Sequence, residues 1–128
     1  MNTFSIQITV QAKDLDYNNH VNNVCYLQWV QDVAEAHWES NTTKELREKY
    51  VWVVINHFIE YKNSAFENEI LTASTYVDNY GTASCERHTE IVRVSDNKLI
   101  VKAKTTWCLL DKKSLKPIRI TEELKNLF

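Results

Sequence analysis

One stretch of the sequence, from Asn22 to about Glu39, constrains the fold more than any other. Its polar residues recur at helical spacing on one narrow stripe, which holds Gln28, Gln31, Asp32, Glu35 and Glu39. The remaining positions are mostly apolar, so the apolar arc of the predicted helix exceeds half its circumference. Such a helix has to be covered by other structure on more than one side. The sequence therefore predicts one long central helix, enclosed by the rest of the chain and capped by Asn22 or Asn23.

Around this helix the chain has the pattern of strands. Residues 4–10 alternate apolar and polar side chains, with the period of two that is typical of a strand with one buried face. After a short helical turn at 42–49, further strands are predicted at 51–61, 68–79, 83–94 and 101–109. The apolar positions expected on one side of the first of these are Val51, Val53, Ile55, Ile59 and Tyr61. This order indicates an α+β fold in which an antiparallel sheet wraps around the helix.

Composition excludes several classes of function. The 128 residues are enough for a single domain, and 15 basic against 17 acidic side chains give a net charge of −2, which argues against a nucleic-acid partner. No window approaches the roughly 18 apolar residues of a membrane span, so no membrane partner is expected. A single glycine cannot form a glycine-rich nucleotide-binding loop. Three widely spaced cysteines are typical of free thiols, which predicts a cytoplasmic protein.

The predicted sheet has two faces, and one helix covers only one of them. The other face and the sheet edges then need shielding, because an unpaired edge strand presents a row of free backbone donors and acceptors. The sequence therefore predicts a homodimer, with strands of two copies pairing edge to edge, and leaves a homotetramer open.

The segment from Asp14 to Asn23 is the candidate site of chemistry. It is mostly polar and lies between a predicted strand and the start of the central helix. Free N–H groups at a helix start stabilise negative charge, including the oxyanion that forms when a carbonyl is attacked. Asp16 and His20 come just before these donors. A carboxylate, an imidazole and backbone amides can therefore converge there on one electrophilic carbonyl.

A longer motif contains these residues, in the order Asp14, Leu15, Asp16, Asn18, His20, Val21, Asn22, Asn23 and Tyr26. It resembles the signature of hotdog-fold thioesterases of the 4-hydroxybenzoyl-CoA thioesterase type, and it is especially similar to the matching segment of plant acyl-ACP thioesterases. The order and lengths of the predicted elements over residues 3–120 also match a hotdog domain. The resemblance implies one hotdog domain, residues 1–128, with an antiparallel sheet around one long helix.

What the resemblance implies about activity is hydrolysis of an acyl-CoA or acyl-ACP thioester to a free acid and a thiol. Asp16 occupies the position of the catalytic carboxylate, which acts as nucleophile or as general base. Asn18 and His20 match residues that plant relatives use beside it. An amide at the helix start polarises the thioester carbonyl. The positions predicted to bind substrate are Val21, Asn22, Asn23, Tyr26, His57 and Ser64.

Two departures from the family pattern bear on this function. Asn19 stands where many bacterial relatives have glycine, and asparagine tolerates the left-handed backbone that such a turn needs. An alignment on Tyr61 places Ser64 and Ala65 where plant enzymes carry an acidic residue and a cysteine. The plant-type carboxylate is then absent, and Asp16 has to act with His20, Asn18 or a partner subunit. The alternative function is a non-catalytic module that binds an acyl thioester or serves as an interaction subunit.

The remaining candidates are assigned from residue type and position. The acyl pocket is expected beside the helix start, with Tyr26, Trp29, Phe58 and Phe66 in its wall. Basic side chains on strands are candidate anchors for CoA phosphates, namely Arg87, Arg93, Lys102 and Lys104. His37 is expected to be a core histidine, and Cys25 a small apolar residue rather than a nucleophile. No His, Cys, Asp or Glu spacing indicates a metal site, and no cofactor is implied.

Overall fold

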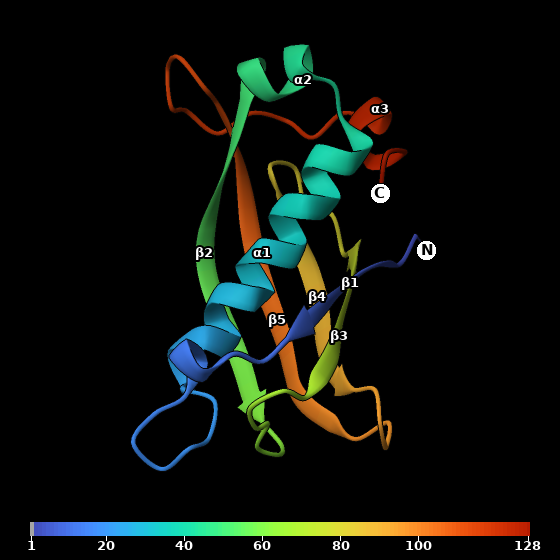
Figure 1. Cartoon of the computed structure of the whole chain (residues 1–128). Helices are drawn as coiled ribbons and strands as arrows, with labels where there is room; N and C mark the ends of the chain where they lie inside the picture. The colour runs from blue at the N-terminus through green and yellow to red at the C-terminus, as the bar shows by residue number, and fades with distance from the viewer. Residues whose placement is uncertain (1) are drawn as a thin grey trace.

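The computed structural model describes residues 2–128, which form a five-stranded antiparallel sheet with one long helix on a single face (Figure 1). The strands are β1 (Phe4–Thr9), β2 (Tyr50–Tyr61), β3 (Ile70–Asp78), β4 (Ser84–Arg93) and β5 (Leu99–Asp111). The helices are α1 (Asn23–Asn41), α2 (Lys44–Lys49) and α3 (Glu122–Lys125), with a short 3-10 turn at Ala12–Asp14. The strand order is β1-β3-β4-β5-β2, so β1 and β2 are the two edges. The α+β class and the order of elements predicted from the sequence are confirmed.

Helix α1 begins where the sequence predicts, because the side-chain oxygen of Asn22 accepts a hydrogen bond from the Val24 amide at 3.0 Å. Its buried face consists of Tyr26, Trp29, Val30, Val33, Ala34 and His37. The helix packs along one face of the sheet (Figure 1), and the C-terminal segment contacts its second half, where the ring of Phe128 stacks on that of Trp38, whereas its first turn lacks such a cover. Val24 remains 70% exposed as a result. The wide apolar arc of α1 therefore exceeds what one chain covers.

The strands keep the predicted alternation except in β2. Along β5, Val101, Ala103 and Thr105 are buried against the helix side while Lys102 and Lys104 are exposed. The pairing of β2 with β5 is antiparallel but shifts between Val54 and Asn56, which makes Ile55 a bulge. A bulge of one residue moves the following side chains to the opposite face.

The prediction that the apolar residues of β2 all lie on one side is therefore wrong. Trp52 and Val54 pair with Leu109 and Trp107 on the helix side, whereas after the bulge Ile59 and Tyr61 take that side opposite Ala103 and Val101. As an edge strand, β2 also carries four large hydrophobic side chains with at least 39% exposure: Val53, Ile55, Phe58 and Tyr61. None of the helices within residues 2–128 is long and apolar enough to cross a membrane.

Candidate active site

The segment before α1 folds into a short hairpin-like loop. Leu15 and Val21 form a β-bridge, and the Asp16 amide donates to the His20 carbonyl at 2.8 Å. The Asn19 amide closes the turn by donating to the Asp16 carbonyl at 3.1 Å, with Asn19 at a φ of 62°. Asparagine tolerates this left-handed backbone, as the sequence predicted for this position. The loop projects from the body on the same side as β2 (Figure 1).

The Asp16 carboxylate is held by its own loop. One oxygen, Oδ1, accepts hydrogen bonds from the amides of Asn18 at 2.8 Å and His20 at 3.3 Å, and the side chain is half-buried. The side chains of Asn18 and His20 are exposed, and the His20 ring meets the ring of Phe66 edge-on at 5.2 Å. The loop thus fixes the carboxylate just ahead of the helix start, through backbone amides and not through the imidazole of His20.

Of the three amides predicted to polarise a carbonyl, two are occupied. The Val21 amide donates to the carbonyl of Ala65 at 3.0 Å, and the Asn22 amide donates to the carbonyl of Asp14 at 2.9 Å. Within residues 2–128 the Asn23 amide has no hydrogen-bond acceptor. Asn23 is the first residue of α1, so its N–H lies at the positive end of the helix dipole. The structure therefore reduces the predicted oxyanion donors to Asn23.

A second loop, between β2 and β3, braces the helix start. The hydroxyl of buried Tyr26 accepts a hydrogen bond from the Ala65 amide at 2.9 Å, and burial raises the pKa of Tyr26. Arg93 donates to the Ser64 carbonyl at 3.2 Å and pairs with Glu69 at 3.0 Å. Sequence reasoning missed this bracing, because its partners lie far apart in the chain and no local pattern signals them.

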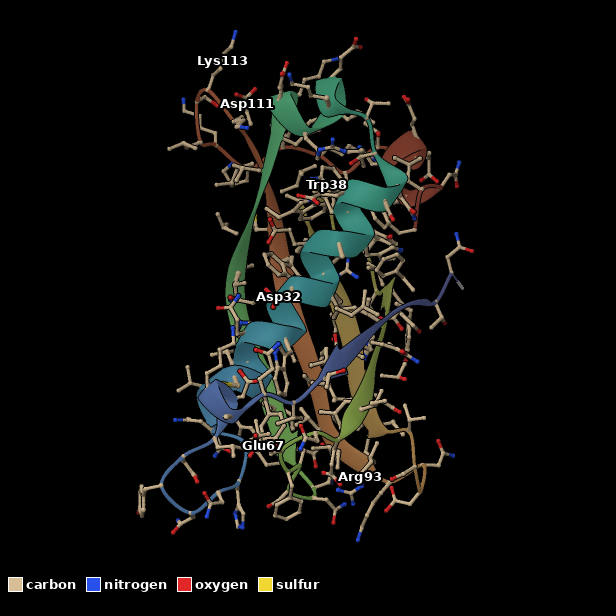
Figure 2. The ribbon with its side chains drawn as sticks, in the orientation of Figure 1. Asp32, Trp38, Glu67, Arg93, Asp111 and Lys113 are labelled. Carbon is tan, nitrogen blue, oxygen red and sulfur yellow. The ribbon has the colours of Figure 1, made fainter. Side chains whose placement is uncertain are left out.

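Figure 2 shows Arg93 at the end of the molecule where α1 begins. Arg93 is only 9% exposed and also pairs with Asp96 at 3.0 Å, so its guanidinium holds two loops together. Arg87 is 7% exposed. The expectation that these two arginines lie near the surface as anchors for CoA phosphates is therefore wrong, because Arg93 is paired with two carboxylates and Arg87 is buried in the fold. Lys102 and Lys104 are exposed on the outer face of the sheet.

His57 lies away from the helix start, about midway along β2. Its Nδ1 is 2.8 Å from the Thr105 hydroxyl, and burial lowers the pKa of this half-buried histidine. Thr105 is in turn paired across the sheet with Arg87. Of the predicted substrate-binding residues, the structure thus gathers Val21, Asn22, Asn23, Tyr26 and Ser64 at one end of α1 and leaves His57 apart from them.

The cavities lie elsewhere than the sequence led us to expect. A cavity of about 580 Å³ is lined by residues from the second half of α1, and its wall includes none of Tyr26, Trp29, Phe58 and Phe66. Phe58 instead borders a groove on the outer face of the sheet. Neither of these two hollows has a residue of segment 14–23 in its wall. Within one chain, the Asp16 loop therefore faces outward beside the β2 edge.

The other singled-out side chains are structural. His37 is 1% exposed, and burial and the neighbouring Arg87 lower its pKa to about 4, as expected of a neutral core histidine. Cys25 is half-buried, its thiol donates to the Asp14 carbonyl at 3.6 Å, and burial raises its pKa. A raised pKa reduces the thiolate that a nucleophile needs. Among residues 2–128, no group of three or more His, Cys, Asp or Glu side chains is placed to hold a metal ion.

Comparisons with known proteins agree with this architecture. A long-chain acyl-CoA thioesterase of Escherichia coli strain K12 is 26% identical over 127 residues, which cover 93% of this chain and 92% of that protein. A chloroplastic palmitoyl-acyl carrier protein thioesterase of Cuphea hookeriana is 29% identical over 100 residues, or 78% of this chain. This chain spans only 22% of the length of that plant relative.

Solved structures give the fold. A 1,4-dihydroxy-2-naphthoyl-CoA thioesterase from Synechocystis superposes with a TM-score of 0.86 over 98% of this chain and 95% of that one, at 15% identity. The helix on a five-stranded antiparallel sheet is thus the hotdog fold. The sequence model of the thioesterase-like superfamily matches residues 10–128. With nearly its whole length matched, the chain belongs to the thioesterase-like superfamily.

Proposed function

We propose that the protein hydrolyses an acyl thioester to a free acid and a thiol. The observation that carries this proposal is the unpaired amide of Asn23 at the start of α1, directly after the loop that holds the Asp16 carboxylate. An unpaired amide at a helix N-terminus is a donor for an oxyanion. The E. coli relative, matched over nearly its whole length, is a long-chain acyl-CoA thioesterase, which supports the same chemistry here.

In this mechanism the thioester carbonyl oxygen accepts a hydrogen bond from the Asn23 amide. Asp16 either attacks the carbonyl carbon itself or takes a proton from a water molecule whose oxygen attacks. The negative charge that develops on the carbonyl oxygen is stabilised by the amide and the helix dipole. When the C–S bond breaks, the sulfur leaves as a thiolate and takes up a proton. If water attacked, the free acid is formed directly; if Asp16 attacked, the acyl group stays on Asp16 as a mixed anhydride, which water hydrolyses to the free acid and the regenerated carboxylate. His20 and Asn18 flank the carboxylate and orient the reacting groups.

The site is completed by a second copy of the chain. The Asp16 loop projects on the side of the β2 edge, and this edge exposes Val53, Ile55, Phe58 and Tyr61. Antiparallel pairing of two β2 strands extends the sheet, covers these side chains and brings the partner subunit against the loop. The same pairing shields the apolar surface of α1 that one chain leaves exposed. We propose this homodimer as the active form, alone or within a homotetramer.

A charge at the β2 edge tests the dimer. Ile55→Lys places a cation at a position that is 58% exposed in one chain, and desolvating that cation between two strands opposes pairing. We expect the variant to sediment as a monomer and to lose most of its thioesterase activity. The matched control is Val94→Lys. Val94 is 51% exposed and lies in the turn that follows β4, away from β2. A monomeric wild type, or a monomeric variant with full activity, contradicts the proposal.

We propose a cytoplasmic location for the protein.

The proposed substrate is either an acyl-CoA or an acyl thioester of acyl carrier protein. The direct test measures thiol release by the wild-type protein from acyl-CoAs and acyl-carrier-protein thioesters of short to long chain length and from an aromatic acyl-CoA. Turnover of at least one thioester is expected. No thiol release from any of them contradicts hydrolysis.

A non-catalytic module that binds acyl thioesters is the second candidate. It is favoured by Ser64, which stands where plant enzymes carry an acidic residue, and by the use of the Asp16 carboxylate to hold its own loop. A ligand that binds only the native state raises its thermal stability. A rise in Tm with acyl-CoA and no thiol release identifies this alternative.

A further inference from the structure

A second candidate site lies at the opposite end of α1 from the Asp16 loop. The cavity of about 580 Å³ opens there between the later turns of α1, the first half of β2 and the C-terminal segment. Aromatic rings form much of its wall, and the ring of Trp38 lies 5.8 Å from that of Trp52 and 5.7 Å from that of Phe128. Figure 2 shows Trp38 in this half of the helix, far from Glu67 at the other end. Small-molecule sites have volumes of roughly 300–1,000 Å³ and walls of this apolar kind.

A buried cation belongs to this wall. Arg87, on β4, is 7% exposed and lines the cavity. Its Nη1 donates to His37 Nδ1 at 2.9 Å and to the Thr75 hydroxyl at 3.1 Å. Both acceptors are neutral. A threonine hydroxyl carries no charge, and His37, whose pKa is about 4, is unprotonated at pH 7. Within residues 2–128, both side-chain hydrogen bonds of Arg87 come from Nη1, and none joins Nε or Nη2 to an acceptor.

No carboxylate balances this charge. Among residues 2–128, no Asp or Glu forms a salt bridge with Arg87. Besides His37, the titratable neighbours that interact with it are Cys85 and Tyr80, and burial raises the pKa of Cys85 to about 11 and that of Tyr80 to about 12. Both are neutral at pH 7, whereas Arg87, with a pKa lowered by burial to about 10, stays protonated. A buried charge of this kind is costly unless an opposite charge pairs with it.

The rest of the wall also presents donors. The Tyr80 hydroxyl and the Trp107 indole N–H are buried in it without a hydrogen-bond partner among residues 2–128, and an indole N–H can only donate. Arg47 and Lys112 add positive charge to the lining, whereas Glu35, on α1, is the carboxylate among the lining residues and is exposed. The cavity therefore has a largely apolar wall. The same wall presents hydrogen-bond donors that lack an acceptor and a positive charge that lacks an anion.

We propose that this cavity binds a carboxylate attached to an apolar body, with the carboxylate on Arg87 and the body against the aromatic wall. A planar guanidinium with two free N–H groups matches a carboxylate in geometry and charge. Two molecules supply this chemistry, a free carboxylic acid and an acyl thioester that carries a second carboxylate at the far end of its acyl group. The proposal does not depend on hydrolysis, since it concerns binding at residues outside the Asp16 loop.

Calorimetric titration of the intact protein with octanoate and with 1-octanol tests it. We expect octanoate to bind the wild type at least about tenfold more tightly than octanol, because hydrogen bonds to a charged group are the stronger ones. Arg87→Met removes the cation and is expected to abolish this preference. Arg119→Met makes the same change at an exposed residue outside the cavity wall and is expected to keep it.

Three results overturn the proposal: octanoate does not bind, octanol binds as tightly to the wild type, or folded Arg87→Met keeps the preference for octanoate. Circular dichroism establishes whether Arg87→Met is folded. If it is not, the comparison of the two ligands on the wild type still decides, because it needs no variant. A protein that releases no thiol from any thioester still gives this binding result, so the two proposals fail separately.

Two further arms identify the source of the carboxylate. If the carboxylate is the far end of a substrate, its acyl chain has to span about 21 Å, because His37, which contacts Arg87, lies 14 residues along α1 from Asn23. The mono-CoA thioester of hexadecanedioic acid then has a higher kcat/KM than hexadecanoyl-CoA in the wild type, and Arg87→Met removes the difference. If it is a free acid, the two thioesters have equal kcat/KM, and octanoate binds without competing with hexadecanoyl-CoA. Either pattern supports a carboxylate on Arg87.

Discussion

Asn23→Pro is expected to lower kcat for thioester hydrolysis by about 10²-fold or more, the usual effect of removing one oxyanion donor. Proline deletes the backbone N–H that we assign to the carbonyl oxygen. It is also favoured at the first position of a helix, where its fixed φ matches the helical backbone. The residue before a proline has to be extended, and Asn22 already has a φ of −65° and a ψ of 135°. The substitution therefore removes the amide without forcing the helix start to change.

Asn23→Ala separates the amide from the side chain. It removes the same side chain as the proline variant and keeps the N–H, so the ratio of the two kcat values reports on the amide alone. Steady-state kinetics with the best thioester substrate and thermal unfolding of both variants supply the measurement. Equal kcat values for the two variants, both folded, would show that the Asn23 amide does not stabilise the oxyanion.

Asp16→Asn is expected to lower kcat by about 10²-fold or more, because an amide is neither a nucleophile nor a base at neutral pH. The loop itself should survive. The side-chain oxygen of asparagine still accepts the hydrogen bonds that Asp16 Oδ1 receives from the amides of Asn18 and His20. The free energy of unfolding should therefore change by no more than about 0.5 kcal/mol.

Two other variants separate catalysis from structure at this position. Asp16→Ala removes the acceptor as well as the charge, so it should cost about 1 kcal/mol of stability in addition to activity. Glu39→Gln makes the same carboxylate-to-amide change at an exposed residue near the other end of α1 and should behave as the wild type does. If Asp16→Asn keeps full activity while Asp16→Ala is destabilised, Asp16 is a loop residue and not a catalyst.

Local patterns in the sequence predicted much of the fold. The N-cap at Asn22 and the alternation along β5 depend on neighbours within one element, so spacing alone reveals them. The bulge at Ile55 was missed because it is defined by the register against β5, and no residue type at that position signals it. The partial enclosure of α1 was missed for a related reason. An apolar surface predicts that something covers it, but not whether the cover comes from the same chain.

The candidate site was predictable in its residues and not in its surroundings. The motif identified the loop and the helix start, yet the choice of Asn23 among three amides required the hydrogen bonds that occupy Val21 and Asn22. For Arg87, in contrast, the sequence suggested the wrong surroundings. Its residue type suggested a surface phosphate anchor, whereas its place on the helix side of β4 buries it among neutral partners. Burial of a charged side chain is a property of the packed layers, which one sequence does not display.

The most direct test of the proposed mechanism is a crystal structure of the Asp16→Asn variant with an intact acyl-CoA thioester bound. We expect the thioester carbonyl oxygen to lie about 3 Å from the Asn23 amide nitrogen, with the carbonyl carbon facing the side chain at position 16 and the β2 edge of a partner subunit beside it. A thioester carbonyl bound elsewhere on the protein, with the Asn23 amide turned to solvent, would contradict it.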